Sequence, residues 1–137
     1  MKKTAEYFVD TSIWIPFFRG ADSRLGDFLD QLIDENRISI NGIVMTELLT
    51  GARNSAEFDR LSSALSGLKF IEMDLPSSEA AGRNGSALKK KGISVPLSDL
   101  IIATDCIVHD FILIERDSHF AAISGHLALR RHSLPAG

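Results

Sequence analysis

Residues 7–15 have the sequence YFVDTSIWI, in which a short apolar run meets a helical pattern at an acidic residue. The residues YFV favour a short strand. Thr11 or Ser12 can then cap a helix that carries Ile13 and Trp14 on its apolar side. We therefore expect Asp10 at the carboxyl end of a strand, directly before a helix.

The same alternation continues along the chain. Apolar runs predict further strands at residues 37–40, 70–71 and 111–114, the last of them typical of a buried parallel strand. Helical spacing of apolar residues predicts helices around 25–32, 43–52, 58–65, 77–91 and 97–109, and a short helix after residue 117. The pattern at 77–91 is weaker, because Gly82 and Gly85 each cost about 1 kcal/mol relative to alanine. Together these elements predict one α/β domain over residues 1–137, with a mostly parallel sheet and helices on both faces.

Composition limits the class of protein. A chain of 137 residues with 45% hydrophobic content is long enough for one sizeable core. It has no apolar run long enough to span a membrane, and MKKTAEYFVD at the start lacks a long apolar signal stretch, so we expect a cytoplasmic protein. The single cysteine, Cys106, lies in an apolar helical pattern and is expected to be a buried packing residue.

Four acidic residues lie where hydrophobic segments meet turns or helices. Asp10 and Asp117 each follow a predicted strand, and ligands of open α/β sheets bind beyond the carboxyl ends of strands. Asp99 lies in the first turn of a predicted helix, where simple capping is an equal alternative. Glu47 lies within a predicted helix, where an exposed glutamate is the alternative.

If the fold brings these carboxylates together, their repulsion requires protons or cations. Oxygen ligands without cysteine suit Mg²⁺ or Mn²⁺ better than zinc. The histidines lack the tight spacing of metal-binding pairs, so none is assigned to a metal: His109, His119, His126 and His132. His119 is expected to be a partly exposed residue at a helix start.

The net charge of −3 argues at first against a nucleic-acid partner, because phosphate binding usually relies on an excess of lysine and arginine. Without the four acids, however, the rest of the chain carries +1. The negative charge would then be concentrated in one pocket, where bound divalent cations neutralise it. A polyanionic partner such as a nucleic acid is therefore compatible with the composition.

The sequences around the four acids occur together and in order: FVDTSIWI, VMTELLTGA, PLSDLIIAT and ILIERDSHF. Together they resemble the PIN-domain ribonucleases, most closely the VapC-type toxins of bacterial and archaeal toxin–antitoxin modules. The resemblance covers about residues 7–120. It implies a PIN-like three-layer α/β/α sandwich and an endoribonuclease that hydrolyses RNA phosphodiester bonds. It also implies that Asp10, Glu47, Asp99 and Asp117 are the catalytic, metal-binding acids.

Several further expectations depend on this resemblance. Mg²⁺ or Mn²⁺ would activate a water that attacks the phosphodiester, which leaves 5′-phosphate and 3′-hydroxyl ends. The implied partners are an antitoxin protein, which covers the acidic pocket and places a basic side chain into it, and a second copy of the chain in a homodimer. Apolar residues either contribute to the antitoxin interface or pack in the core: Trp14, Phe17, Phe18, Leu48 and Leu49.

One position departs from the family pattern. Glu115 stands two residues before Asp117, where the family commonly has serine or threonine. Glu115 either joins the metal ligands or points away from them, and we favour the second alternative. Thr11 and Ser12 retain the small hydroxyl residues expected after Asp10.

Two other classes of function remain open from the sequence. A magnesium-dependent phosphorylation receiver also has acids at strand ends, but it needs an early acidic pair and a lysine after a late strand, which this chain lacks. A binding module that keeps the fold with little catalysis is the other alternative. Retention of all four acids argues against it.

Overall fold

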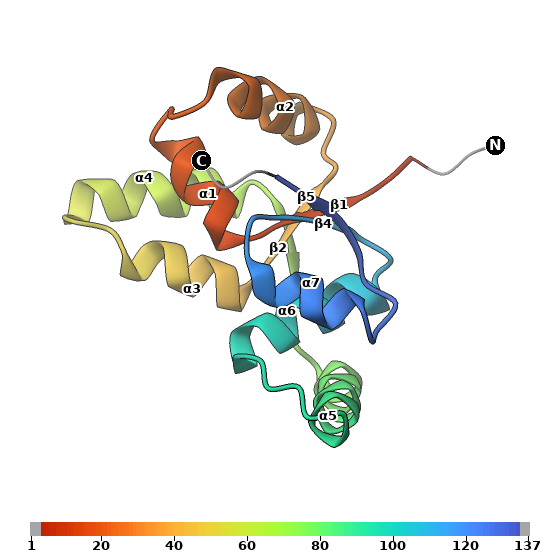
Figure 1. The fold of residues 1–137 in the computed structure, drawn as a ribbon. Coiled ribbons are helices and arrows are strands. Elements are labelled where there is room, and N and C mark those ends of the chain that lie inside the picture. Colours follow the sequence, from red (N-terminus) through yellow and green to blue (C-terminus); the bar gives the residue numbers. More distant parts are fainter. Residues whose placement is uncertain (1–3, 135–137) are drawn as a thin grey trace.

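A five-stranded sheet forms the centre of the computed structural model, which describes residues 4–134 (Figure 1). The strands are β1 (Tyr7–Val9), β2 (Ile38–Asn41), β3 (Lys69–Ile71), β4 (Ile112–Glu115) and β5 (Arg130–Ser133). Their order is β3-β2-β1-β4-β5, and every neighbouring pair is parallel. The carboxyl ends of the neighbouring strands β1 and β4 therefore lie side by side.

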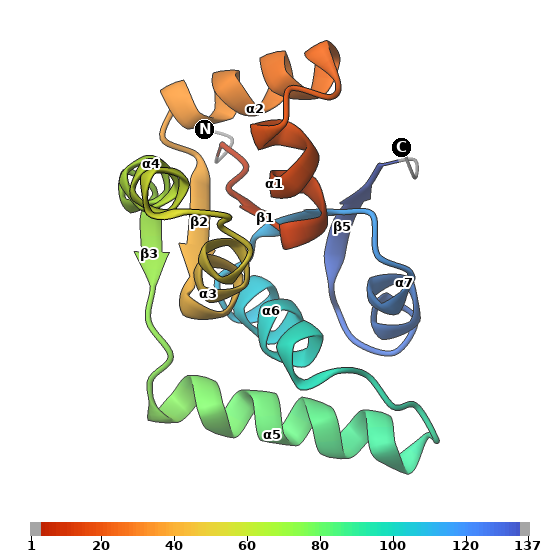
Figure 2. The ribbon, with the colours of Figure 1, turned by 90° about the vertical axis from the view of Figure 1, so that its left-hand side faces the viewer.

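Seven helices connect these strands within the described part of the chain. They are α1 (Thr11–Phe18), α2 (Ser23–Asp34), α3 (Gly42–Thr50), α4 (Ser55–Ser66), α5 (Leu75–Lys90), α6 (Leu97–Val108) and α7 (Ser118–Ser124). Crossovers between parallel strands are almost always right-handed. With this strand order, the connections from β1 to β2 to β3 therefore place α1–α4 on one face, and the return to β4 and β5 places α5–α7 on the other. Figure 2 shows α6 between α5 and the sheet. The arrangement confirms the expected α/β/α architecture.

The core is centred on β1 and β4. Phe8, Val9, Leu113 and Ile114 are completely buried, as expected for strands covered on both faces. Cys106 on α6 is also buried, and this burial raises the pKa of its thiol well above the ordinary range. The cysteine is therefore a packing residue, as predicted.

Strand β5 was not expected, because its sequence RRHS contains no apolar run. It pairs with β4 at the edge of the sheet, where polar and charged side chains are tolerated on the exposed side. Arg130 forms an ion pair with Asp110, and Arg131 with Glu115. The strand is thus held by backbone pairing and by charge, neither of which produces a hydrophobic pattern.

Helix α5 is continuous through both of its glycines. A Cβ atom on Gly85 would lie 2.8 Å from Cδ2 of Leu100, so the missing side chain allows α5 and α6 to approach closely. Gly92, which follows the C-cap residue Lys91 of α5, has a φ of +74°, a left-handed conformation that glycine adopts readily at a helix end. The close packing of Gly85 against Leu100 positions the start of α6, where Asp99 lies.

In the part of the chain that the structure describes, no helix is both long and apolar enough to cross a membrane.

Candidate metal centre

Asp10 follows β1 directly and is the N-cap of α1. Its Oδ2 accepts hydrogen bonds from the Ser12 amide at 3.1 Å and the Ser12 hydroxyl at 2.6 Å. The expectation that Thr11 or Ser12 caps this helix was therefore wrong, because the acid itself occupies the cap. Asp10 is only 5% exposed, and this burial raises the pKa of its carboxyl group. The charge of Asp117 raises it to a smaller degree, while the hydrogen bonds from Ser12 oppose the rise.

Ser12 also joins the two strand ends. Its Oγ accepts a hydrogen bond from the amide of Arg116 at 3.3 Å while it donates to Asp10. In addition, the amide of Asp10 donates to the carbonyl oxygen of Ile114 at 3.0 Å. These bonds hold the loop after β1 against the loop after β4, which carries Asp117.

Asp99 lies in the first turn of α6 and is 7% exposed. It makes no capping bond, since the N-cap position is Pro96 and has no side-chain cap. Its pKa is raised to about 6, chiefly by burial and then by the charge of Asp117, with a smaller contribution from Asp10. The capping alternative is therefore not supported, and the carboxylate is instead part of a group of like charges.

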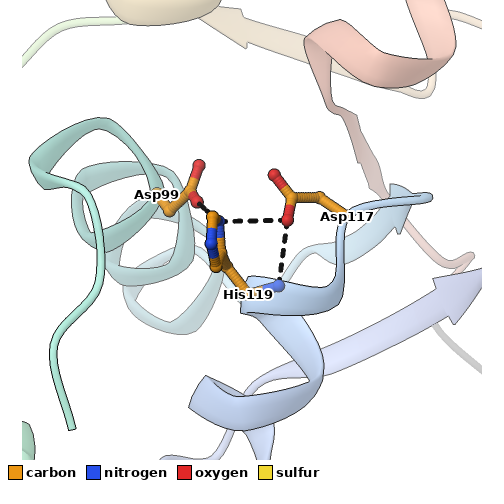
Figure 3. A group of neighbouring side chains, drawn as sticks. All are labelled: Asp99, Asp117 and His119. Atoms are coloured by element: carbon orange, nitrogen blue, oxygen red, sulfur yellow. Dashed lines mark hydrogen bonds and ion pairs between the residues drawn. The ribbon is translucent and has the colours of Figure 1, made fainter.

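His119 lies between Asp99 and Asp117, as Figure 3 shows. Its Nδ1 is 2.8 Å from Oδ2 of Asp99 and 3.1 Å from Oδ1 of Asp117. The amide of His119 donates to the same Asp117 oxygen at 2.9 Å, because Asp117 is the N-cap of α7. The histidine is partly exposed at a helix start, as predicted, but sequence reasoning missed its contact with two acids.

Glu47 lies at the edge of this group. It is exposed on α3, and its Oε1 accepts a hydrogen bond from the Thr11 hydroxyl at 3.0 Å. Glu47 is thus hydrogen-bonded to Thr11, the residue that follows Asp10. Over residues 4–134, the acids and histidines whose ligand atoms all lie within 4.8 Å of one another are Asp99, Asp117 and His119, without Glu47 or Asp10.

Glu115 is the last residue of β4 and is 1% exposed. Its Oε1 accepts a hydrogen bond from Nη1 of Arg131 at 3.0 Å, on the neighbouring strand β5. Its charge is not among the causes that raise the pKa of Asp10 or Asp99. The structure therefore pairs this carboxylate with an arginine of the sheet edge.

The three aspartates come from the ends of β1 and β4 and from the start of α6, and the charge of Asp117 contributes to the raised pKa of both Asp10 and Asp99. Carboxylate oxygens that repel one another in a partly buried position suit a hard divalent cation, which would remove the repulsion. The donor set therefore fits such a cation.

A family model for the PIN domain matches residues 7–125. The chain therefore belongs to the PIN domain family.

Among its relatives, Ribonuclease VapC11 of Mycobacterium tuberculosis is 27% identical over 120 residues, which cover 85% of this chain and 90% of the relative. VapBC2 from Rickettsia felis, solved bound to a DNA fragment from their promoter, matches the fold with a TM-score of 0.80 and 22% identity over 93% of this chain and 98% of that one. A toxin–antitoxin complex from Klebsiella pneumoniae matches with a TM-score of 0.71 and 26% identity, over 88% and 94% of the two chains.

Proposed function

We propose that this protein is a metal-dependent endoribonuclease that hydrolyses RNA phosphodiester bonds, and that it is the toxin of a type II toxin–antitoxin system. The observation that carries the proposal is the convergence of Asp10, Asp99 and Asp117 at the carboxyl edge of a PIN-family sheet. Relatives that match 85% of the chain are named as ribonucleases. A catalytic group at this edge of a parallel sheet agrees with the general position of active sites in α/β folds.

In this proposal the four acids Asp10, Glu47, Asp99 and Asp117 hold Mg²⁺ or Mn²⁺. A divalent cation supplies a Lewis acid that lowers the pKa of a water and neutralises charge on a phosphate group. Ser12 holds the Asp10 carboxylate in one orientation through two hydrogen bonds, and Thr11 does the same for Glu47 through one. Water is the nucleophile, so no covalent intermediate with the protein is required.

Glu115 has no part in this set of ligands. Its carboxylate is buried against Arg131, and removal of that arginine would leave a buried negative charge without its partner. We infer that the glutamate at this family position has a structural role at the edge of the sheet. The serine or threonine that the family commonly has there would not make such an ion pair.

The proposed protein partner is an antitoxin. Solved complexes with a similar fold include toxin–antitoxin assemblies, such as the one from Klebsiella pneumoniae. Of the apolar residues considered for that interface, Trp14 and Leu48 are buried in the core, whereas Phe18 is 39% exposed on α1. Phe18 is therefore the better candidate for a contact with the antitoxin. A homodimer remains part of the proposal.

The receiver alternative is disfavoured by the sheet. Receiver-type domains have the strand order 2-1-3-4-5, whereas this sheet has the order β3-β2-β1-β4-β5. A phosphate-accepting aspartate would also need a free carboxylate oxygen beside a lysine, and the basic residue next to Asp117 is Arg116. A PIN-fold module with little catalysis remains the competing proposal, and activity distinguishes it.

The test is incubation of purified protein with total RNA in Mg²⁺, in Mn²⁺ and in EDTA, followed by mapping of the cut ends. We expect cleavage with either metal, none in EDTA, and products with 5′-phosphate and 3′-hydroxyl ends, because water attacks the phosphorus. Cyclic 2′,3′-phosphate ends, or undiminished cleavage in EDTA, would contradict the proposed hydrolysis. Absence of cleavage under all conditions, by folded protein freed of antitoxin, would favour the binding module.

A further inference from the structure

The imidazole of His119 lies beside two carboxylates of the candidate metal centre. Its Nδ1 and one oxygen from each of Asp99 and Asp117 lie within 4.8 Å of one another. The individual separations from Nδ1 to the two oxygens are 2.8 and 3.1 Å. Adjacent ligands of an octahedral cation with bonds of about 2.1 Å lie about 3 Å apart, so these atoms already have the spacing of neighbouring ligands.

The position of this imidazole is fixed by the start of α7. Asp117 caps the helix and accepts the backbone N–H of His119, so the acid and the histidine are held together by the same turn. The His119 side chain is 49% exposed and the Asp117 side chain 32%, whereas the Asp99 side chain is 10% exposed. His119 and Asp117 are therefore the more exposed members of the group and Asp99 is the most buried, and all three side chains point toward one another (Figure 3).

We propose that His119 is a direct metal ligand in this protein and that it biases the site toward Mn²⁺ over Mg²⁺. The inference rests on the proposed use of a divalent cation by the aspartates, and adds to it a nitrogen ligand and a preference between metals. Mg²⁺ is bound almost entirely by oxygen, whereas first-row transition metals accept imidazole. A carboxylate site that also contains an imidazole ligand therefore favours Mn²⁺ more than a site of carboxylates alone.

If His119 instead competes with the metal for the carboxylates, its removal has a different effect on metal affinity. In the structure His119 bonds to both carboxylates, so it either becomes a ligand when the ion enters or stays as a competitor that the ion must displace. Removal of a ligand weakens metal binding, whereas removal of a competitor strengthens it. The sign of the change in affinity therefore separates the two roles.

The experiment compares wild type, His119→Ala and the control His126→Ala, whose histidine is exposed in the loop after α7. The full-length protein is titrated with Mn²⁺ alone and with Mg²⁺ alone by calorimetry, and pulsed EPR of the Mn²⁺ complex records coupling to ¹⁴N. We expect His119→Ala to weaken Mn²⁺ binding by about 10-fold or more and Mg²⁺ binding by less than about 3-fold. The ¹⁴N coupling should be present in wild type and His126→Ala and lost in His119→Ala.

Unchanged or tighter Mn²⁺ binding by His119→Ala would overturn the inference. The wild-type spectrum is a second test that depends on no variant, and a Mn²⁺ complex without ¹⁴N coupling would overturn it as well. Neither readout uses RNA. A protein that binds Mn²⁺ through nitrogen but cuts no RNA would therefore contradict the proposed function alone, whereas RNA cleavage with no nitrogen ligand would contradict this inference alone.

Discussion

Replacement of Asp99 by asparagine is expected to lower the rate of RNA cleavage by on the order of 10³-fold or more, which corresponds to about 4 kcal/mol of transition-state stabilisation. Asparagine has nearly the same shape and keeps an oxygen that accepts a hydrogen bond from His119, but it loses the negative charge that holds a cation. Asp10→Asn should have a similar effect, because Asp10 and Asp99 belong to the same group of interacting carboxylates. The measurement is the initial rate of cleavage of total RNA in Mg²⁺ and in Mn²⁺.

Asp30→Asn is the matched control, since Asp30 is an exposed aspartate on α2 with the same chemical change. It should cleave RNA within about twofold of wild type. Equal cleavage by wild type, Asp10→Asn and Asp99→Asn would assign the activity to a contaminant or to another part of the protein.

In the absence of metal, Asp99→Asn is expected to be more stable than wild type at neutral pH, by up to about 3 kcal/mol. The folded-state pKa of Asp99 is about 6, whereas an aspartate in an unfolded chain has a pKa near 3.9. Protonated Asp99 is therefore favoured by folding, and this contribution to stability is fully present below about pH 4 and is lost as the pH rises through about 6. Above that pH the wild type contains a buried, repelled charge that the variant lacks.

Thermal unfolding followed by circular dichroism in EDTA, at pH 4 and at pH 7.5, measures this difference. The melting temperature of Asp99→Asn should exceed that of wild type by several degrees at pH 7.5, and the gap should shrink at pH 4. Addition of Mn²⁺ at pH 7.5 should raise the melting temperature of wild type more than that of the variant, because binding to the folded state stabilises it. A gap that does not change with pH would show that burial and repulsion of Asp99 do not control its ionisation.

The positions of the acids could be predicted because local patterns determine them. Asp10 and Asp117 follow short apolar runs that predict strands, and parallel strands bring their carboxyl ends to one edge. The helix that carries Asp99 is rich in apolar residues that become buried, so its first turn was also placed correctly.

The features that were missed depend on contacts between distant residues. β5 has a polar sequence and exists through pairing with β4, so periodicity could not reveal it. The direction of Glu115 follows from Arg131 on that strand, and the sequence alone left it open. The contact of His119 with Asp99 joins residues 20 positions apart, and only the proximity of His119 to Asp117 in the sequence gave a signal.

The ligand role of Glu47 remains a prediction. Its hydrogen bond with Thr11 places it beside Asp10. Its carboxylate oxygens, however, are not part of the group formed by Asp99, Asp117 and His119, whose ligand atoms lie within 4.8 Å of one another. A two-metal site would use it at a second position, whereas a one-metal site would leave it in solvent. The number of ions bound in the calorimetric titrations distinguishes these arrangements.

The central claim is that Asp10, Asp99 and Asp117 share a divalent cation. A crystal of the protein grown with Mn²⁺ tests this claim most directly. An anomalous difference map at the manganese absorption edge should contain a peak about 2.2 Å from oxygens of Asp99 and Asp117. No peak at these side chains at saturating Mn²⁺, or peaks only at other acids on the surface, would contradict the account.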